Sequence, residues 1–171
     1  MCSLFLFYYK EIVDLTAESE IDPQADIRQQ AFRLLARREY SYRELQQRFE
    51  RQFGPDDVVQ ALDQLVEDGY QSDRRFCGVF VRSRIGQLQG LNKVRFDMRQ
   101  KGIPESLLNE VLEEEAPDWY ALAREARMRR FPQLDRKDRK LMAKVMRHLL
   151  QRGFNMDEAR YAIEVDDEDW R

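Results

Sequence analysis

Apolar residues recur about every 50 positions along this chain, and the period limits the architectures open to it. One set is Tyr42, Leu45, Phe49, Val58, Val59 and Leu62, and its counterpart 49 positions later is Leu91, Val94, Met98, Leu107, Leu108 and Val111. A further shift of 51 positions places four of these positions on Met142, Val145, Leu149 and Ala162. Spacings of three and four residues are typical of helices, so the period indicates one helical unit used three times.

A unit of about 50 residues buries too little apolar surface alone, so neighbouring copies must stack on one another. The predicted fold is therefore all-α, an elongated tandem array of three three-helix repeats. We predict repeats at 27–71, 72–117 and 118–171, the last ending in an acidic tail. Residues 1–26 are expected to form an N-terminal extension, either poorly ordered or packed on the first repeat.

Capping residues divide the repeats into helices. Ser41 and Glu44 have the spacing of a capping box, in which each side chain accepts from a free amide at the helix start. Ser72 is placed to cap the first helix of the second repeat, and Asn155 with Glu158 to cap the last helix.

Three finer expectations concern helix limits and faces. The first repeat is predicted to begin near Ile27. In the second repeat the inward residues are expected to be Phe76, Val79 and Phe80. In the third, a long helix is predicted from about Asp135 to Arg152.

The N-terminal run Ser3–Tyr9 is mostly apolar but far shorter than the roughly 20 residues that span a bilayer. No basic residue precedes it, so neither a signal peptide nor a membrane-surface anchor is predicted. The chain has two cysteines at unrelated places, Cys2 and Cys77, which make no disulfide framework and indicate a reducing cytoplasm.

Charge is sorted along the chain, although the net charge is only −3. Residues 72–101 hold eight Lys and Arg against two acids, and residues 124–152 hold eleven against three. The stretch between them, 103–118, holds six acids and no base. The basic segments at equivalent places of successive repeats favour a continuous positive groove that faces an anionic partner.

The candidate partner-binding residues are the Lys and Arg side chains of these segments. They are Arg82, Arg84, Lys93, Arg95, Arg99 and Lys101 in the second repeat, and Arg139, Lys140, Lys144, Arg147 and Arg152 in the third. The partner is either a nucleic acid or an acidic protein surface. The plainer interpretation is a set of ordinary solvated helix faces.

No pattern of catalytic or ligand-binding residues is present. The single histidine, His148, has no acidic residue nearby in the sequence to orient it, and neither cysteine has a partner at zinc-binding spacing. The chain contains no phosphate-binding glycine motif. We therefore expect no enzyme activity, cofactor or metal.

Several separated stretches resemble the RecX regulatory proteins. They are Leu34–Ser41 with Glu44-Leu45; Asp68–Tyr70, Asp73, Arg75-Phe76 and Arg82–Arg84; Gly90, Val94, Arg95, Met98 and Lys101–Ile103; Asp118-Trp119, Leu122-Ala123, Leu149 and Arg152–Phe154. The likeness covers about residues 27–163, and it is distributed rather than confined to one motif.

The resemblance implies a triple repeat of three-helix units that binds RecA recombinase filaments. Proteins of this family lodge in the filament groove and inhibit strand exchange, ATP hydrolysis and co-protease activity, and some members bind DNA directly. It implies no catalytic residues.

The expected function is that of a cytoplasmic, monomeric modulator of homologous recombination and the SOS response, with weak direct binding to DNA as a secondary property. The alternative is a sequence-nonspecific nucleic-acid-binding protein that competes for DNA. A plain helical scaffold is a third interpretation, and it requires the basic faces to have no role.

Overall fold

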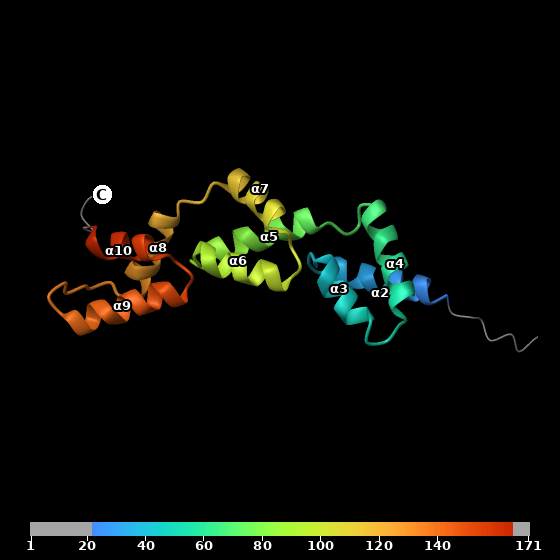
Figure 1. Cartoon of the computed structure of the whole chain (residues 1–171), viewed down its shortest axis with the longest axis horizontal. Helices are drawn as coiled ribbons and strands as arrows, with labels where there is room; N and C mark the ends of the chain where they lie inside the picture. Colours follow the sequence, from blue (N-terminus) through green and yellow to red (C-terminus); the bar gives the residue numbers. More distant parts are fainter. Residues whose placement is uncertain (1–21, 166–171) are drawn as a thin grey trace, which may run out of the picture.

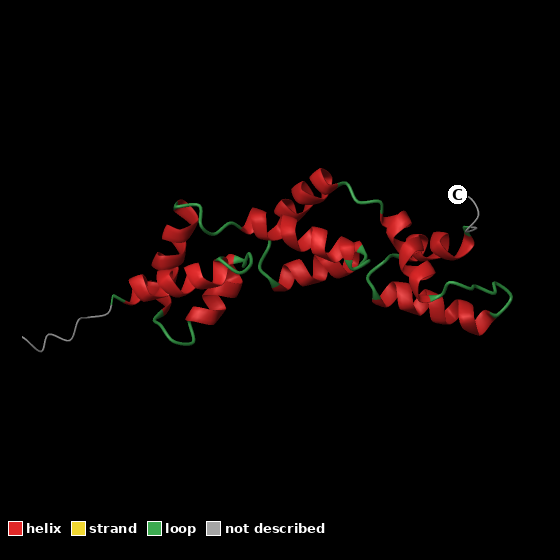
Figure 2. Ribbon diagram, turned by 180° about the vertical axis from the view of Figure 1, so that it is seen from behind, coloured by secondary structure: helices red, strands yellow, loops and turns green. Residues whose placement is uncertain are grey.

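The structure, a computed structural model, describes residues 22–165, which form helices joined by short loops with no strand among them (Figures 1 and 2). The helices are α2 (Pro23–Leu35), α3 (Tyr42–Phe49), α4 (Pro55–Glu67), α5 (Asp73–Gly86), α6 (Leu91–Gln100), α7 (Glu105–Glu115), α8 (Trp119–Arg130), α9 (Arg139–Gln151) and α10 (Met156–Glu164). The molecule is elongated, with three helices in each successive third. The predicted all-α tandem array is confirmed.

Each group of three helices has an apolar core of its own. We call α2–α4 unit 1, α5–α7 unit 2 and α8–α10 unit 3. Their second helices contribute Leu45, Val94 and Val145 to the three separate cores, and all three side chains are fully buried. The loops before α5 and α8 contain the predicted domain limits, which stay predictions.

The predicted caps are present. Ser41 and Glu44 form a capping box at α3, and Asn155 and Glu158 form another at α10. Ser72 Oγ accepts from the backbone amide of Arg75 at the start of α5.

Two predicted helix limits are wrong by several residues. Helix α2 begins at Pro23 instead of Ile27, because the Asp22 side chain accepts from the amide of Gln24 and caps the helix earlier. Helix α9 begins at Arg139 instead of Asp135. The Asp138 carboxylate caps it, and Asp135 turns the preceding loop by accepting from the amide of Lys137.

The repeat register also differs in the third helices. Val58 is buried in α4 and Leu108 in α7, 50 positions apart, whereas Val59 is 37 % exposed. The turn before α7 is one residue longer than the turn before α4, since Met98 precedes the N-cap Pro104 by six positions and Phe49 precedes the N-cap Gly54 by five. The shift of 49 therefore holds in the second helices only.

The predicted inward face of α5 is also partly wrong. Phe76 is buried and Phe80 packs partly buried against the core of unit 2, but Val79 is 48 % exposed. Cys77 and Val81, which lie beside Phe76 and Phe80 and away from Val79 on the helix, are buried as well.

Glycine turns dock each unit on the one before it. The turn after α9 contains Gly153, whose φ of +92° lets its carbonyl accept from the amide of Asn92 at 3.0 Å. The turn after α6 contains Gly102, which lies against the Arg43 side chain at the start of α3. The end of each second helix thus meets the beginning of the previous one, and the three run head to tail.

Candidate functional site

The second helices α9, α6 and α3 form a row along the lower side of the molecule in Figure 1, and Figure 2 shows the same row from behind. Helix α7 lies on the opposite side in both views. Most of the predicted basic residues belong to α6 and α9, so the helices that carry them lie on one side of the array.

Helix α9 presents unpaired positive charge. Arg139, Lys140, Lys144 and Arg147 are exposed, while Val145 and Leu149 on the other face are buried. None of the four forms an ion pair with a residue of the described part of the chain. The Lys144 ammonium lies 6.0 Å from the centroid of the Phe131 ring. These side chains keep their charge available to a partner.

Helix α6 is different, because acids beside it neutralise most of its bases. Asp97 pairs with Lys93 at 2.8 Å and with Arg84 of α5 at 3.3 Å. Arg95 pairs with Glu105, the first residue of α7, at 2.8 Å. Arg99 is exposed and pairs with no acid within residues 22–165.

The three remaining predicted residues have structural partners. Arg82 pairs with Glu115 of α7 at 2.5 Å. Lys101 pairs across the unit boundary with Glu44 of α3 at 2.6 Å. Arg152 donates from Nε to the carbonyl of Leu88 at 2.9 Å and also donates to the carbonyl of Gln87, so it joins units 2 and 3.

The charge count of the third repeat includes arginines that serve packing. Arg127 is only 1 % exposed and donates from Nε to the carbonyl of Ala162 at 2.9 Å. Arg136 donates in the same way to the carbonyl of Ile163 at 3.1 Å. For Arg127 the sequence held a signal, because it lies four residues after Ala123 on the apolar face of α8.

The acids of α7 were missed as charge partners by sequence reasoning. Glu110 and Glu114 both pair with Arg74 of α5, the first at 2.8 Å. Together with Glu105 and Glu115 they explain why a helix with no base follows a strongly basic segment. They pair with bases of the same unit, so α9 keeps more unpaired bases than α6 among the described residues.

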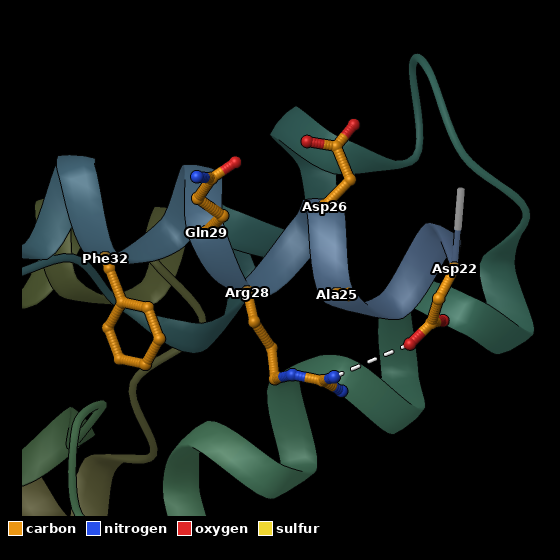
Figure 3. A pocket seen from close by; sticks show the side chains of 6 residues that line it. All are labelled: Asp22, Ala25, Asp26, Arg28, Gln29 and Phe32. Carbon is orange, nitrogen blue, oxygen red and sulfur yellow. Dashed lines mark ion pairs between the residues drawn. The ribbon is translucent and has the colours of Figure 1, made fainter. Parts of the chain in front are cut away.

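A hollow of about 740 Å³ lies along one face of α2 in unit 1 (Figure 3). It is lined by Asp22, Ala25, Asp26, Arg28, Gln29 and Phe32. Arg28 and Asp22 form an ion pair across it at 3.6 Å. These six described residues include no Ser, Cys, His or Lys, and Asp26 and Gln29 point away from the pair of Arg28 and Asp22 (Figure 3).

The titratable residues singled out in the sequence have ordinary packing roles. Burial, with Arg152 and Arg130 nearby, lowers the pKa of His148, whose ring packs edge-on against Phe131 at 5.5 Å. Burial raises the pKa of the Cys77 thiol to about 11, so it stays protonated near neutral pH. Residues 22–165 contain no cluster of His, Cys, Asp and Glu able to hold a metal ion, and no helix there has the length and apolar character needed to cross a bilayer.

The fold is that of a tandem helical-repeat protein with basic residues on two of its second helices, and comparisons with known proteins show the family. The model of the RecX second three-helix domain matches residues 72–112, and that of the third matches residues 117–163. Regulatory protein RecX of Chromohalobacter salexigens is 44 % identical over 141 residues, which cover 82 % of this chain and 92 % of the relative. Regulatory protein RecX of Halorhodospira halophila is 40 % identical over 144 residues, which cover 84 % of this chain and 89 % of the relative.

Solved structures show the same fold. A crystal structure of regulatory protein RecX superposes with a TM-score of 0.71 at 23 % identity, covering 85 % of this chain and 75 % of the other. The crystal structure of RecX from Lactobacillus salivarius superposes with a TM-score of 0.68 at 17 % identity, covering 83 % of this chain and 95 % of the other. The chain belongs to the RecX family of regulatory proteins.

Proposed function

We propose that this chain binds the RecA recombinase filament and inhibits its ATP hydrolysis, strand exchange and co-protease activity, thereby modulating homologous recombination and the SOS response. It acts in the cytoplasm as a monomer, by contact rather than catalysis. Family membership supports this function, since the relatives carry the name of regulatory protein RecX.

The observation that carries the proposal is the unpaired charge of α9. Its four exposed bases have no ion-pair partner in residues 22–165, whereas Lys93, Arg95 and Lys101 at α6 are already compensated. A charge that is already paired adds little to an encounter with an anionic surface, while an unpaired one attracts it. We therefore assign the main filament contact to α9, extended by Arg99 on α6.

The elongated shape supports a groove-bound position. The three second helices run head to tail, so one molecule offers contact points along most of its length (Figure 1). Contacts made together by one chain combine through effective concentration, so several weak ones give a tight complex. One molecule should then influence several recombinase subunits at once.

The proposal is tested by the ATPase activity of RecA filaments on single-stranded DNA. Wild-type chain should slow hydrolysis well below one molecule per recombinase subunit. The variant Lys140→Glu/Lys144→Glu should need at least about tenfold more protein for the same effect, because removing close charge pairs across an interface costs at least ~1.5 kcal/mol.

A control variant applies the same charge change elsewhere. Arg33→Glu/Arg37→Glu alters two exposed arginines, in α2 and the loop after it, and should inhibit like wild type. Hydrolysis that continues unchanged at excess wild-type protein, both on preformed filaments and during assembly, contradicts the proposal.

Sequence-nonspecific binding to DNA is the second candidate function, and the same row of bases on α9 favours it. If phosphates are the main partner, naked single-stranded DNA should bind substantially, with log affinity falling by about 0.7 for each phosphate contact against log salt. If the recombinase is the main partner, naked DNA should bind weakly while filaments bind tightly. We favour the second result, because Lys93 and Arg95 of α6 are already paired with Asp97 and Glu105, so a phosphate backbone extending across unit 2 would meet little available positive charge there.

A further inference from the structure

Phe96 on α6 stands out among the apolar side chains. At 55 % exposure it is the most exposed large apolar residue in residues 22–165. The other exposed aromatics there pack edge to face with a second ring, Phe32 with Tyr70 and Tyr120 with Tyr161. Among the described residues the ring of Phe96 makes no contact with another ring, and the Lys93 ammonium lies 5.2 Å from its centroid.

The position of Phe96 is the outermost on its helix. It lies two residues from both Val94 and Met98, which are buried, so helical spacing points it away from the core. The repeat spacing of the second helices places Gln47 at the same position in α3 and Arg147 in α9. A polar residue therefore suits this position in both neighbouring units, and folding gives no reason for a phenylalanine.

The surroundings of Phe96 are basic. Arg99 lies three residues further along α6, on the same side of the helix, and is exposed without an acid partner in the described residues. The junction of units 2 and 3 continues this surface onto α9, because the turn after α9 is hydrogen-bonded to the start of α6. An isolated aromatic side chain thus lies between the unpaired bases of α9 and Arg99 of α6.

We infer that Phe96 is the apolar anchor of the partner contact, inserting into an apolar pocket of a protein surface rimmed by carboxylates. Binding energy at protein interfaces is concentrated in a few aromatic and arginine side chains surrounded by weaker polar contacts, and Phe96 with Arg99 fits that pattern. A nucleic acid fits less well. Platforms for single strands stack successive bases on several aromatics, whereas this surface offers one, beside the carboxylates of Asp97 and Glu105.

The inference rests on the proposed function, which supplies the partner for the test. Binding to RecA filaments and to the same naked single-stranded DNA is measured for wild type, Phe96→Ala, Phe96→Leu and a control, Val79→Ala. Val79 is 48 % exposed on α5, outside the basic row. Phe96→Ala should bind filaments at least about tenfold more weakly, as expected for a hot-spot residue. Phe96→Leu should lose less filament affinity than Phe96→Ala, and Val79→Ala should keep its filament affinity within about twofold of wild type. All variants should have the melting temperature of wild type.

The outcomes separate the two proposals. Filament binding by wild type with equally tight binding by Phe96→Ala overturns the anchor and leaves the proposed function standing. Loss of naked-DNA binding in Phe96→Ala, with filament binding kept, also overturns it and assigns the ring to base stacking. Wild type that does not bind filaments overturns the proposed function and, with it, this inference.

Discussion

Units 2 and 3 are joined by backbone–backbone hydrogen bonds and by the Arg152 side chain donating to backbone carbonyls, whereas the contacts between units 1 and 2 involve carboxylate side chains. At the junction of units 2 and 3 the amide of Gly90 donates to the carbonyl of Arg152 at 2.9 Å, and the amide of Asn92 donates to the carbonyl of Gly153. Gly90, the N-cap of α6, has no side chain to accept from the free amides at the start of the helix. The backbone carbonyls that follow α9 accept from them instead. The packing is so close that a Cβ on Gly90 would lie 2.3 Å from the backbone nitrogen of Phe154.

At the junction of units 1 and 2, helix α3 carries its own capping box, and side chains make the contacts. The amide of Tyr42 donates to the Asp73 carboxylate at 2.8 Å, and Lys101 pairs with Glu44. Arg75 pairs with Glu39 at 3.0 Å. Successive second helices thus dock in the same way, through backbone hydrogen bonds at one junction and through carboxylate contacts at the other. The backbone junction fixes α6 and α9 as one surface, while the side-chain junction depends on charge.

The comparison predicts that unfolding of unit 3 destabilises unit 2 more than unfolding of unit 1 does. Val145→Asp and Leu45→Asp each place an uncompensated charge in a fully buried site, which costs about 3–5 kcal/mol. Val145→Asp should also increase amide exchange in α6, because the carbonyls that cap it are lost. Leu45→Asp should leave α6 protected. Hydrogen exchange measured segment by segment checks this, and equal effects on α6 would break the comparison.

A series of glycine variants tests the close packing. Gly153→Ala combines left-handed strain with a Cβ 2.4 Å from the Cβ of Lys93, and should cost about 3 kcal/mol. Gly102→Ala has the same strain, but its Cβ would meet only side-chain atoms of Arg43, the Cδ at 2.8 Å and the less mobile Cβ at 2.9 Å, and no backbone atom. Gly69 is the control, since it has a φ of +75° and no neighbour within 4 Å, so its alanine variant should cost only about 1 kcal/mol.

Thermal melts should rank the three variants in that order. A Gly153→Ala variant no less stable than Gly69→Ala would show that the junction of units 2 and 3 is looser than described.

Acid should weaken the junction of units 1 and 2 selectively. Burial alone would raise the pKa of Glu44, but hydrogen bonds from Lys101, Arg38 and the amide of Ser41 outweigh it and lower the pKa. A carboxyl whose pKa is lower when folded contributes stability above its unfolded pKa of about 4.3, and that stability is lost as pH falls through the lower folded value. The junction should therefore be complete above about pH 5 and lose on the order of 1 kcal/mol in more acid solution.

Glu44→Gln is the matched control, because glutamine also serves in a capping box. Its stability should change less between pH 6 and pH 3 than that of wild type. The junction of units 2 and 3 has no carboxylate among the contacts described, so exchange of the Asn92 amide, corrected for its intrinsic pH dependence, should be the same in both proteins. A wild type and variant with parallel pH profiles would remove Glu44 from the junction.

The fold was largely predictable because the period and the caps are local signals. Leu45, Val94 and Val145 follow from spacing alone, and Ser41 with Glu44 from a motif. The register of α7 could not be predicted, because a single extra residue in the preceding turn moves the buried position from Leu107 to Leu108 without changing the apolar pattern.

The candidate surface was only partly predictable. Sequence separates bases from acids along the chain, but pairing depends on which helices pack together. Arg82 and Glu115 are 33 positions apart and meet only because α5 lies against α7. Phe96 was missed because one apolar residue on a polar face leaves no periodic signal.

The most direct test compares the paired and the unpaired bases. Lys144→Ala/Arg147→Ala removes two charges that have no partner in residues 22–165, and Arg82→Ala/Lys93→Ala removes two that pair with Glu115 and Asp97. The affinity for RecA filaments should fall at least about tenfold for the first variant and at most about threefold for the second, since compensated charges add little to an interface. Equal losses, or a greater loss for Arg82→Ala/Lys93→Ala, would contradict the assignment of the partner surface to α9.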